Sequence, residues 1–226
     1  MTRESFLSQV RQAAEMGRAY RVQVRAVPPE TGYVGASSAD GMAAAAREIE
    51  AVGGVAHRVS TDEQARQTIL ALLRQYAARR VLAWRHPVLT ELRLSTLVAE
   101  QAIEWLDHEL LAELPAEERR QQALASDVGI TSADWLIAET GSLVLRARPG
   151  QERWASLLPP VHIAVIRRYQ IIPDLIDVFQ ALRDHGLDQL TSHITLVTGP
   201  SKTGDIELQL TTGVHGPGHW HVVLIG

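Results

Sequence analysis

Apolar residues recur along this 226-residue chain with two spacings, one typical of helices and one typical of strands. The helical spacing appears first over residues 3–16, and a glycine follows it as a plausible C-cap. Residues 18–36 contain two adjacent prolines and two glycines, which predict an irregular, partly extended connection. The pattern therefore predicts a helix and arm over residues 1–36, and one α/β domain over residues 37–226. Whether the arm packs on its own domain or on a second subunit, as in a homo-oligomer, stays open.

From about residue 38 the pattern alternates between helix and strand. Residues 42–52 are typical of a helix that ends at a Gly-Gly pair, and residues 55–59 of a short strand. Ser60 as N-cap and Glu63 three residues later predict the start of the next helix. A buried strand at residues 81–84 follows that helix. Strand, helix and strand at this spacing predict a βαβ unit with parallel strands.

In the second half of the chain the predicted strands come closer together. Residues 88–125 are helix-rich, and Pro115 fits the first position of a helix. Residues 139–141 predict a tight hairpin turn. The predicted fold class is α/β, with a central, mostly parallel sheet flanked by helices and preceded by the N-terminal helical arm. The remaining predicted elements are strands at 125–130, 135–138, 142–146, 162–166, 194–198 and 219–225, and a helix at 173–182.

Composition narrows the range of functions. The formal charge of -4 and the scattered arginines give no reason to expect a nucleic-acid partner. There are no cysteines, so the chain forms no disulfide and ligates no cysteine-bound iron–sulfur cluster. The N-terminus lacks the apolar region of a signal peptide, and no apolar run is long enough to span a membrane. We therefore expect a cytoplasmic protein without a membrane span.

Lysine occurs only once, because the 22 basic residues are 21 arginines and Lys202. This lysine lies in a Gly/Pro/Ser loop directly after the apolar run 194–197, which is typical of a buried strand. Loops at strand ends often hold ligands in α/β proteins, and an ammonium beside hydroxyl and backbone N–H groups binds phosphate or carboxylate. The alternative, a residual surface lysine in an arginine-rich chain, stays open. The residues of this loop predicted to bind a ligand are Gly199, Ser201, Lys202, Thr203 and Asp205.

The loop is not a Walker A motif, because Gly199 precedes Lys202 by only three residues. Asp205 has two interpretations of similar weight. It either holds Lys202 or a water in place, or it only stabilises the turn.

A second group of polar residues surrounds the predicted hairpin. Glu139, beside Thr140 and Gly141, is a candidate general base or nucleophile. The alternatives are a turn acid bonded to backbone N–H groups, and a residue that lines a site without reacting, which is favoured over the other two. Thr131 and Asp134 cluster at a strand end, where they either cap a turn or line a cleft.

Two histidines are candidates for the same cleft. His215 lies in a glycine-containing loop and is a candidate acid–base catalyst, and His162 begins a strand and is a candidate ligand-binding residue. His219 and His221 share a strand face, but without a third ligand nearby they favour a core-edge position over a metal site. The tryptophans are spread over different elements and predict packing in the core or the cleft.

Four ordered motifs resemble the LUD domain family. They occupy residues 127–143, 156–163, 199–207 and 213–217, and they begin with Asp-Val-Gly-Ile-Thr-Ser-Ala-Asp at residues 127–134. The size of the chain and its lack of cysteine resemble the lactate-utilisation protein C branch of that family.

The resemblance implies a fold like that of the NagB/RpiA/CoA-transferase superfamily, and a part in the oxidation of L-lactate to pyruvate. It implies an accessory subunit that binds an anionic small molecule in a cleft at strand ends. It further implies that this chain binds no cofactor and that iron–sulfur clusters are carried by partner subunits. In the family an arginine also occurs where Lys202 stands, which implies a cation that binds an anion rather than a Schiff-base amine.

An alternative function stays open beside this one. It is a stand-alone enzyme of the CoA-transferase or sugar-phosphate isomerase type, acting on a phosphate- or CoA-bearing substrate. In such an enzyme Lys202 holds the anion and Glu139 carries out the chemistry.

Overall fold

The computed structural model describes residues 2–17, 40–186, 190–204 and 210–226. Contacts divide the chain into two units, Met1–Val34 and Gly35–Gly226. In the first unit, helix α1 (Arg3–Gly17) forms where the sequence predicts it, and its apolar side chains Phe6, Leu7 and Val10 are exposed. The predicted connection over residues 18–36 lies outside the described residues.

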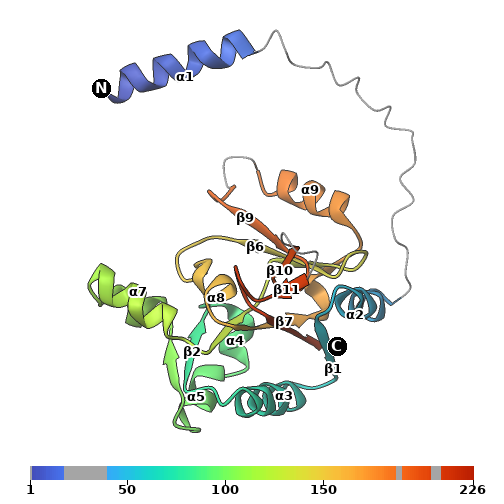
Figure 1. The fold of residues 1–226 in the computed structure, drawn as a ribbon. Coiled ribbons are helices and arrows are strands. Elements are labelled where there is room, and N and C mark those ends of the chain that lie inside the picture. Colours follow the sequence, from blue (N-terminus) through green and yellow to red (C-terminus); the bar gives the residue numbers. More distant parts are fainter. Residues whose placement is uncertain (1, 18–39, 187–189, 205–209) are drawn as a thin grey trace. The chain divides into compact units, whose positions relative to one another are not determined.

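The second unit is built on six parallel strands, as the sequence predicted (Figure 1). Their spatial order is β1-β12-β7-β4-β2-β3. The central strands are buried along almost their whole length, because a parallel sheet is covered on both faces and its strands are therefore continuous apolar runs. The six strands are β1 (Val55–Val59), β2 (Arg80–Ala83), β3 (Glu104–Leu106), β4 (Val128–Thr131), β7 (Val161–Arg167) and β12 (His219–Ile225).

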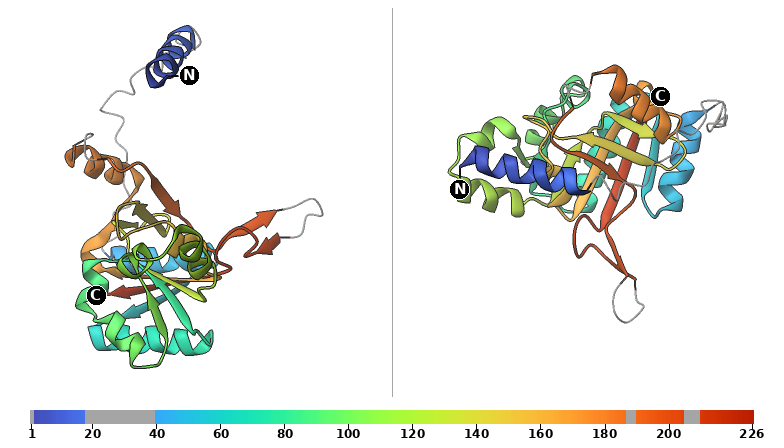
Figure 2. Two further views of the ribbon diagram at one scale, coloured as in Figure 1. Left: turned by 90° about the vertical axis from the view of Figure 1, so that its left-hand side faces the viewer. Right: turned by 90° about the horizontal axis from the view of Figure 1, so that it is seen from above.

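Helices cover both faces of this sheet (Figures 1 and 2). Helices α3, α4 and α5 lie on one face, and α2 and α8 lie on the other, where they meet Trp220 and Gly129. The helix bounds are α2 (Gly41–Ala51), α3 (Asp62–Gln75), α4 (Pro87–Glu91), α5 (Leu94–Ala99), α6 (His108–Ala112), α7 (Ala116–Leu124) and α8 (Trp154–Leu157).

A second sheet of four strands lies over the face that carries α2 and α8, and the sequence did not predict it as a separate layer (Figure 1). Its order is β8-β5-β6-β9, and the predicted hairpin joins β5 to β6. Ile137, Val144, Val178 and Leu182 form a small core between this sheet and α9. The bounds are β5 (Trp135–Ile137), β6 (Ser142–Arg146), β8 (Ile171–Ile172), β9 (Ile194–Val197), α9 (Leu175–Asp184), the 3₁₀ helix η2 (Arg168–Gln170), and the separate hairpin β10 (Lys202–Gly204) and β11 (Leu210–Thr212).

Three local predictions were wrong. The N-cap of α3 is Thr61, because the backbone N–H of Ser60 donates instead to the Gln64 amide oxygen at 2.8 Å. The strand predicted from residue 125 begins at Val128, because α7 ends only at Leu124 and Ala125 is its C-cap. The run predicted as a buried strand at 194–197 is the edge strand β9, and it is partly exposed.

Two glycines allow close contacts that fix the layers. A Cβ at Gly129 would lie 1.7 Å from the carbonyl oxygen of Ala155, so only glycine lets α8 approach β4 this closely. Gly141, with φ +66°, brings the hairpin against α2, where a Cβ would lie 2.6 Å from the backbone nitrogen of Ile49. At Gly129 the close approach is therefore made by a helix.

Gly129→Ala should destabilise the fold by about 3 kcal/mol, because the new methyl group would overlap backbone atoms that cannot rotate away. Urea unfolding monitored by circular dichroism measures the change. Gly41→Ala is the matched control. Gly41 is the first residue of α2, and a Cβ there would lie at an ordinary contact distance of 3.4 Å from the Ile171 side chain. A Gly129→Ala protein as stable as the control would contradict this account of how α8 is held.

Candidate functional site

A cleft of ≈ 210 Å³ lies at the N-terminal ends of β7 and β12. Its walls come from α8, β7, β9, the loop after β9 and the loop before β12, which are far apart in the sequence. The fold brings together four of the predicted site residues in this lining: His162, Gly199, Ser201 and His215. Among the residues that the structure describes, no aspartate, glutamate, lysine or arginine lines the cleft, so the polar side chains there are hydroxyls, imidazoles and an indole.

Two buried side chains of the cleft carry polar atoms without a hydrogen-bond partner. His162 and Trp220 lie side by side on adjacent strands and are fully or almost fully buried. Trp220 Nε1 and His162 Nδ1 have no partner among the described residues. An indole N–H only donates, and leaving a buried donor unpaired costs about 1–3 kcal/mol. The cleft is therefore suited to a ligand that offers hydrogen-bond acceptors.

The second nitrogen of His162 is held by Thr131, another predicted site residue. The distance between Thr131 Oγ1 and His162 Nε2 is 2.8 Å, and both side chains are buried. Burial lowers the pKa of His162 to about 3, so the imidazole is neutral at neutral pH. When the Thr131 hydroxyl donates to Nε2, the proton of the neutral ring lies on Nδ1, and this nitrogen becomes a second donor.

A chain of three hydroxyl groups leads from the surface to the cleft. The oxygen of exposed Thr140 lies 2.7 Å from that of buried Ser142, which lies 2.6 Å from Thr198 Oγ1 in the cleft lining. Because each hydroxyl both donates and accepts, the chain can present Thr198 to the cleft as a donor. Thr140 therefore acts on the cleft through two other residues.

The glycine loop that begins one wall of the cleft is fastened to the C-terminus of α2. Lys202 Nζ donates to the carbonyl oxygen of Val52, the C-cap residue of α2, at 2.6 Å. A cation at this position is favoured by the helix dipole. Gly199, with φ +98°, packs against the same carbonyl, 2.9 Å from the position of a Cβ. Lys202 is outside the cleft lining, and its binding of a ligand stays a prediction.

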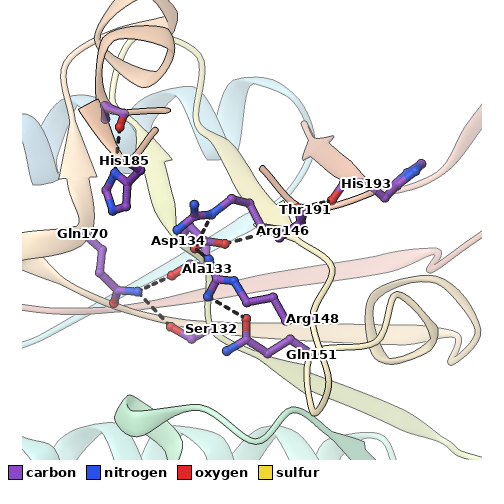
Figure 3. A network of polar contacts seen from close by, with 11 residues as sticks. Ser132, Ala133, Asp134, Arg146, Arg148, Gln151, Gln170, His185, Thr191 and His193 are labelled. Carbon is purple, nitrogen blue, oxygen red and sulfur yellow. Dashed lines mark hydrogen bonds and ion pairs between the residues drawn. The ribbon is translucent and has the colours of Figure 1, made fainter. Parts of the chain in front are cut away.

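Asp134 is held between two arginines of the next strand and loop, as Figure 3 shows. Its carboxylate accepts from Arg146 Nε at 2.8 Å and pairs with Arg148, and it also accepts from the backbone N–H of Arg146 at 2.9 Å. The Asp134 and Arg146 side chains are only 7% and 11% exposed. Loss of one partner from such a buried ion pair strongly destabilises a protein. We therefore expect Asp134 to stabilise the second sheet.

Two other predicted residues are outside the cleft lining. Glu139 is exposed on the β5–β6 turn, and its backbone N–H donates to the carbonyl of Pro173 at 3.0 Å. Thr203 pairs with Thr211 in the β10–β11 hairpin. Asp205 lies outside the described residues. The fold thus brings part of the predicted set together and separates the rest.

His219 and His221 of β12 lie on the opposite face of the sheet from Trp220. His221 Nε2 lies 2.7 Å from the hydroxyl of Tyr76, and His221 Nδ1 lies 3.1 Å from His57 Nε2. Burial, and then the charges of His57 and His219, lower the pKa of His221 to about 4. No three His, Asp or Glu side chains are grouped to hold a metal ion in the part of the chain that the structure describes.

Three residues of the site were missed by sequence reasoning, namely Trp220, Thr198 and Ser142. Trp220 was interpreted only as packing, although its place between His219 and His221 on a strand puts it on the other face. Thr198 directly follows β9, and Ser142 begins β6 beside the hairpin. Their link is a contact across the second sheet, which the spacing of residues along the chain does not indicate.

The chain is similar to known proteins of one family. A family model for the LUD domain matches residues 42–225. "Lactate utilization protein C" of Exiguobacterium sp. is 32% identical over 99% of this chain and 95% of its own length. The protein of that name from Halalkalibacterium halodurans is 35% identical over 67% of this chain, and the match spans 64% of that relative, which is less than two thirds.

Among solved structures, the crystal structure of a DUF162 family protein from Deinococcus radiodurans is similar in fold. Its TM-score is 0.55 at 22% identity, over 82% of this chain and 96% of that chain. None of the helices described here is both long and apolar enough to cross a membrane.

His162→Gln should make the fold less sensitive to acid. The buried imidazole has a lowered pKa, so as pH falls below about 6.5 the unfolded chain binds a proton that the folded chain does not, and stability is lost toward pH 3. Between pH 6 and 4 the variant should lose up to ~1.4 kcal/mol less per pH unit than the wild type. Urea unfolding at several pH values measures this slope.

The control for this experiment is His185→Gln at the exposed end of α9, which should keep the wild-type slope. The burial of His221 supplies a similar acid sensitivity in all three proteins. Equal slopes for His162→Gln and the wild type would show that the imidazole at position 162 takes up its proton in the folded state.

Proposed function

Because the chain belongs to the LUD domain family and its relatives are named for lactate utilisation, we propose that it serves in the utilisation of L-lactate. In this role it acts as an accessory subunit that binds a small anion in the cleft at the N-terminal ends of β7 and β12. The observation that supports an anionic ligand is that two buried atoms without a hydrogen-bond partner, Trp220 Nε1 and His162 Nδ1, belong to residues of one cleft.

The cleft favours an anion because several of its polar side chains can be arranged as donors. Trp220 donates in every state, and His162 and Thr198 donate when Thr131 and Ser142 donate to them. A carboxylate accepts several such bonds, and hydrogen bonds to a charged group are about twice as strong as neutral ones. No carboxylate of the described residues lines the cleft, which favours a ligand with negative charge.

The size of the cleft supports a small ligand. Its ≈ 210 Å³ is several times the ~30 Å³ that one water occupies in the liquid. A short 2-hydroxy or 2-oxo acid such as lactate or pyruvate suits this volume. His215, exposed at the cleft, adds positive charge when it is protonated.

An accessory role follows from what lactate oxidation needs. Conversion of lactate to pyruvate releases two electrons, which partner subunits with iron–sulfur clusters would accept. The 226 residues contain no cysteine to ligate a cluster of the cysteine type. The alternative of a stand-alone CoA-transferase-like enzyme has less support, because Glu139 lies on an exposed turn outside the cleft lining.

Deletion of the gene should abolish growth on L-lactate as sole carbon source, while growth on glucose continues. Wild type should restore growth, and Trp220→Phe should restore it less well, because it removes one donor and keeps an aromatic side chain. Trp105→Phe, at the edge strand β3, is the matched control and should restore growth fully. Normal growth of the deletion strain on lactate would refute the role, and lactate oxidation by the purified chain alone would refute its accessory nature.

Binding tests the cleft itself. In calorimetric titrations of the purified protein, L-lactate or pyruvate should bind, and Trp220→Phe should weaken binding by about five- to tenfold through the loss of one hydrogen bond to an anion. Trp105→Phe should bind as the wild type does. If Trp220→Phe keeps the wild-type affinity, the indole N–H has no ligand and the cleft is not the anion site.

A further inference from the structure

A second cavity, which shares no residue with the cleft, lies at the C-terminal end of β2. Its volume is ≈ 140 Å³, and its walls are the end of β2, the helices α6 and α8, and part of α7. Trp84 and Trp154 both line it, together with Leu82, Leu111 and Ala155. The cavity is therefore mainly apolar and large enough for a molecule of a few heavy atoms.

One charged side chain in this apolar lining lacks a counter-ion. Arg119 of α7 donates through Nη2 to the carbonyl oxygen of Leu114 at 3.1 Å, and its Nε is buried without a hydrogen-bond partner. No carboxylate lies within ion-pair distance of Arg119 among the described residues. The Arg119 side chain is half-buried, and its guanidinium stays charged, so a positive charge without a counter-ion lies at the wall of an apolar cavity. The position therefore suits an external anion.

The acidic residues of the same lining are already engaged elsewhere. Glu152 Oε1 lies 2.5 Å from His108 Nδ1 and accepts from the backbone N–H of Gly150 at 3.0 Å. Asp107 caps α6 by accepting from two backbone N–H groups. Both carboxylates therefore have hydrogen-bond partners other than Arg119. They also orient the His108 ring at the edge of the cavity, with Nδ1 facing Glu152.

We propose that this cavity binds a small monocarboxylate with a short apolar body. The carboxylate pairs with the planar fork of Arg119, for which its two oxygens are the matching acceptor. The apolar body lies among Trp84, Trp154 and Leu111. One free cation and apolar walls suit a single negative charge better than a phosphate dianion, which needs more donors.

This site is distinct from the proposed anion cleft, and its test has its own reporter. Trp154 and Trp84 line the second cavity, whereas Trp220 lines the cleft. Butyrate added to the purified full-length chain should change the tryptophan fluorescence saturably, and butyramide, which has the same shape without the charge, should not. Trp154→Phe should remove most of the response, and Trp220→Phe should leave it in place. Loss of the response only in Trp220→Phe would place butyrate in the cleft and overturn the second site.

The charge of Arg119 is tested by a matched pair of variants on one helix. Arg119→Gln should weaken butyrate binding roughly tenfold or more, because a hydrogen-bonded ion pair is lost. Arg120→Gln, at the exposed next residue of α7, should bind as the wild type does. Unchanged affinity in Arg119→Gln, or equal binding of butyrate and butyramide by the wild type, would overturn the proposal. If Arg119→Gln does not fold, Arg119→Lys replaces it and should bind butyrate more weakly than the wild type, and unchanged affinity would again overturn the proposal.

Discussion

The absence of a side chain at Gly129 is the constraint on which the candidate site depends. It lets the carbonyl of Ala155 reach the surface of the sheet, which places α8 directly over β4. In register, Gly129 lies beside His162, and the His162 ring reaches Thr131 two residues further along β4. The same small residue therefore fixes the position of α8, which forms a wall of the cleft. A Cβ here would displace α8, because the nearest contact atoms belong to the Ala155 backbone.

The cleft and the cavity at the end of β2 differ in their electrostatic environment. In the cleft, neutral donors such as Trp220 and the His162–Thr131 pair carry the polarity, and burial keeps the imidazole uncharged. In the cavity at the end of β2, a full positive charge on Arg119 lies among apolar walls. Neutral donors cost less to desolvate and hold an anion by directed hydrogen bonds, whereas a guanidinium attracts it over a longer range.

The arginines of β6, of the loop after it and of β7 carry charges that are compensated within the protein. Arg146 and Arg148 are paired with Asp134, and Arg167 is paired with Asp62 and Glu91. Lys202, the single lysine, is held at the end of α2. A basic residue thus indicates a ligand only when the structure leaves it without a carboxylate, and residue type alone does not reveal this.

The sequence by itself determined the α/β class, the parallel strands and most element positions, because continuous apolar runs and helical spacing are local properties of the chain. It also indicated that His162, the glycine loop at residue 199 and His215 belong together, through the motifs that resemble the LUD domain. Tertiary structure decided that Lys202 meets Val52, that Asp134 meets two arginines, and that Trp220 Nε1 and Arg119 Nε have no hydrogen-bond partner among the described residues. These contacts join residues distant in the chain, and a polar side chain's role depends on which partner the packing of layers brings within hydrogen-bond distance.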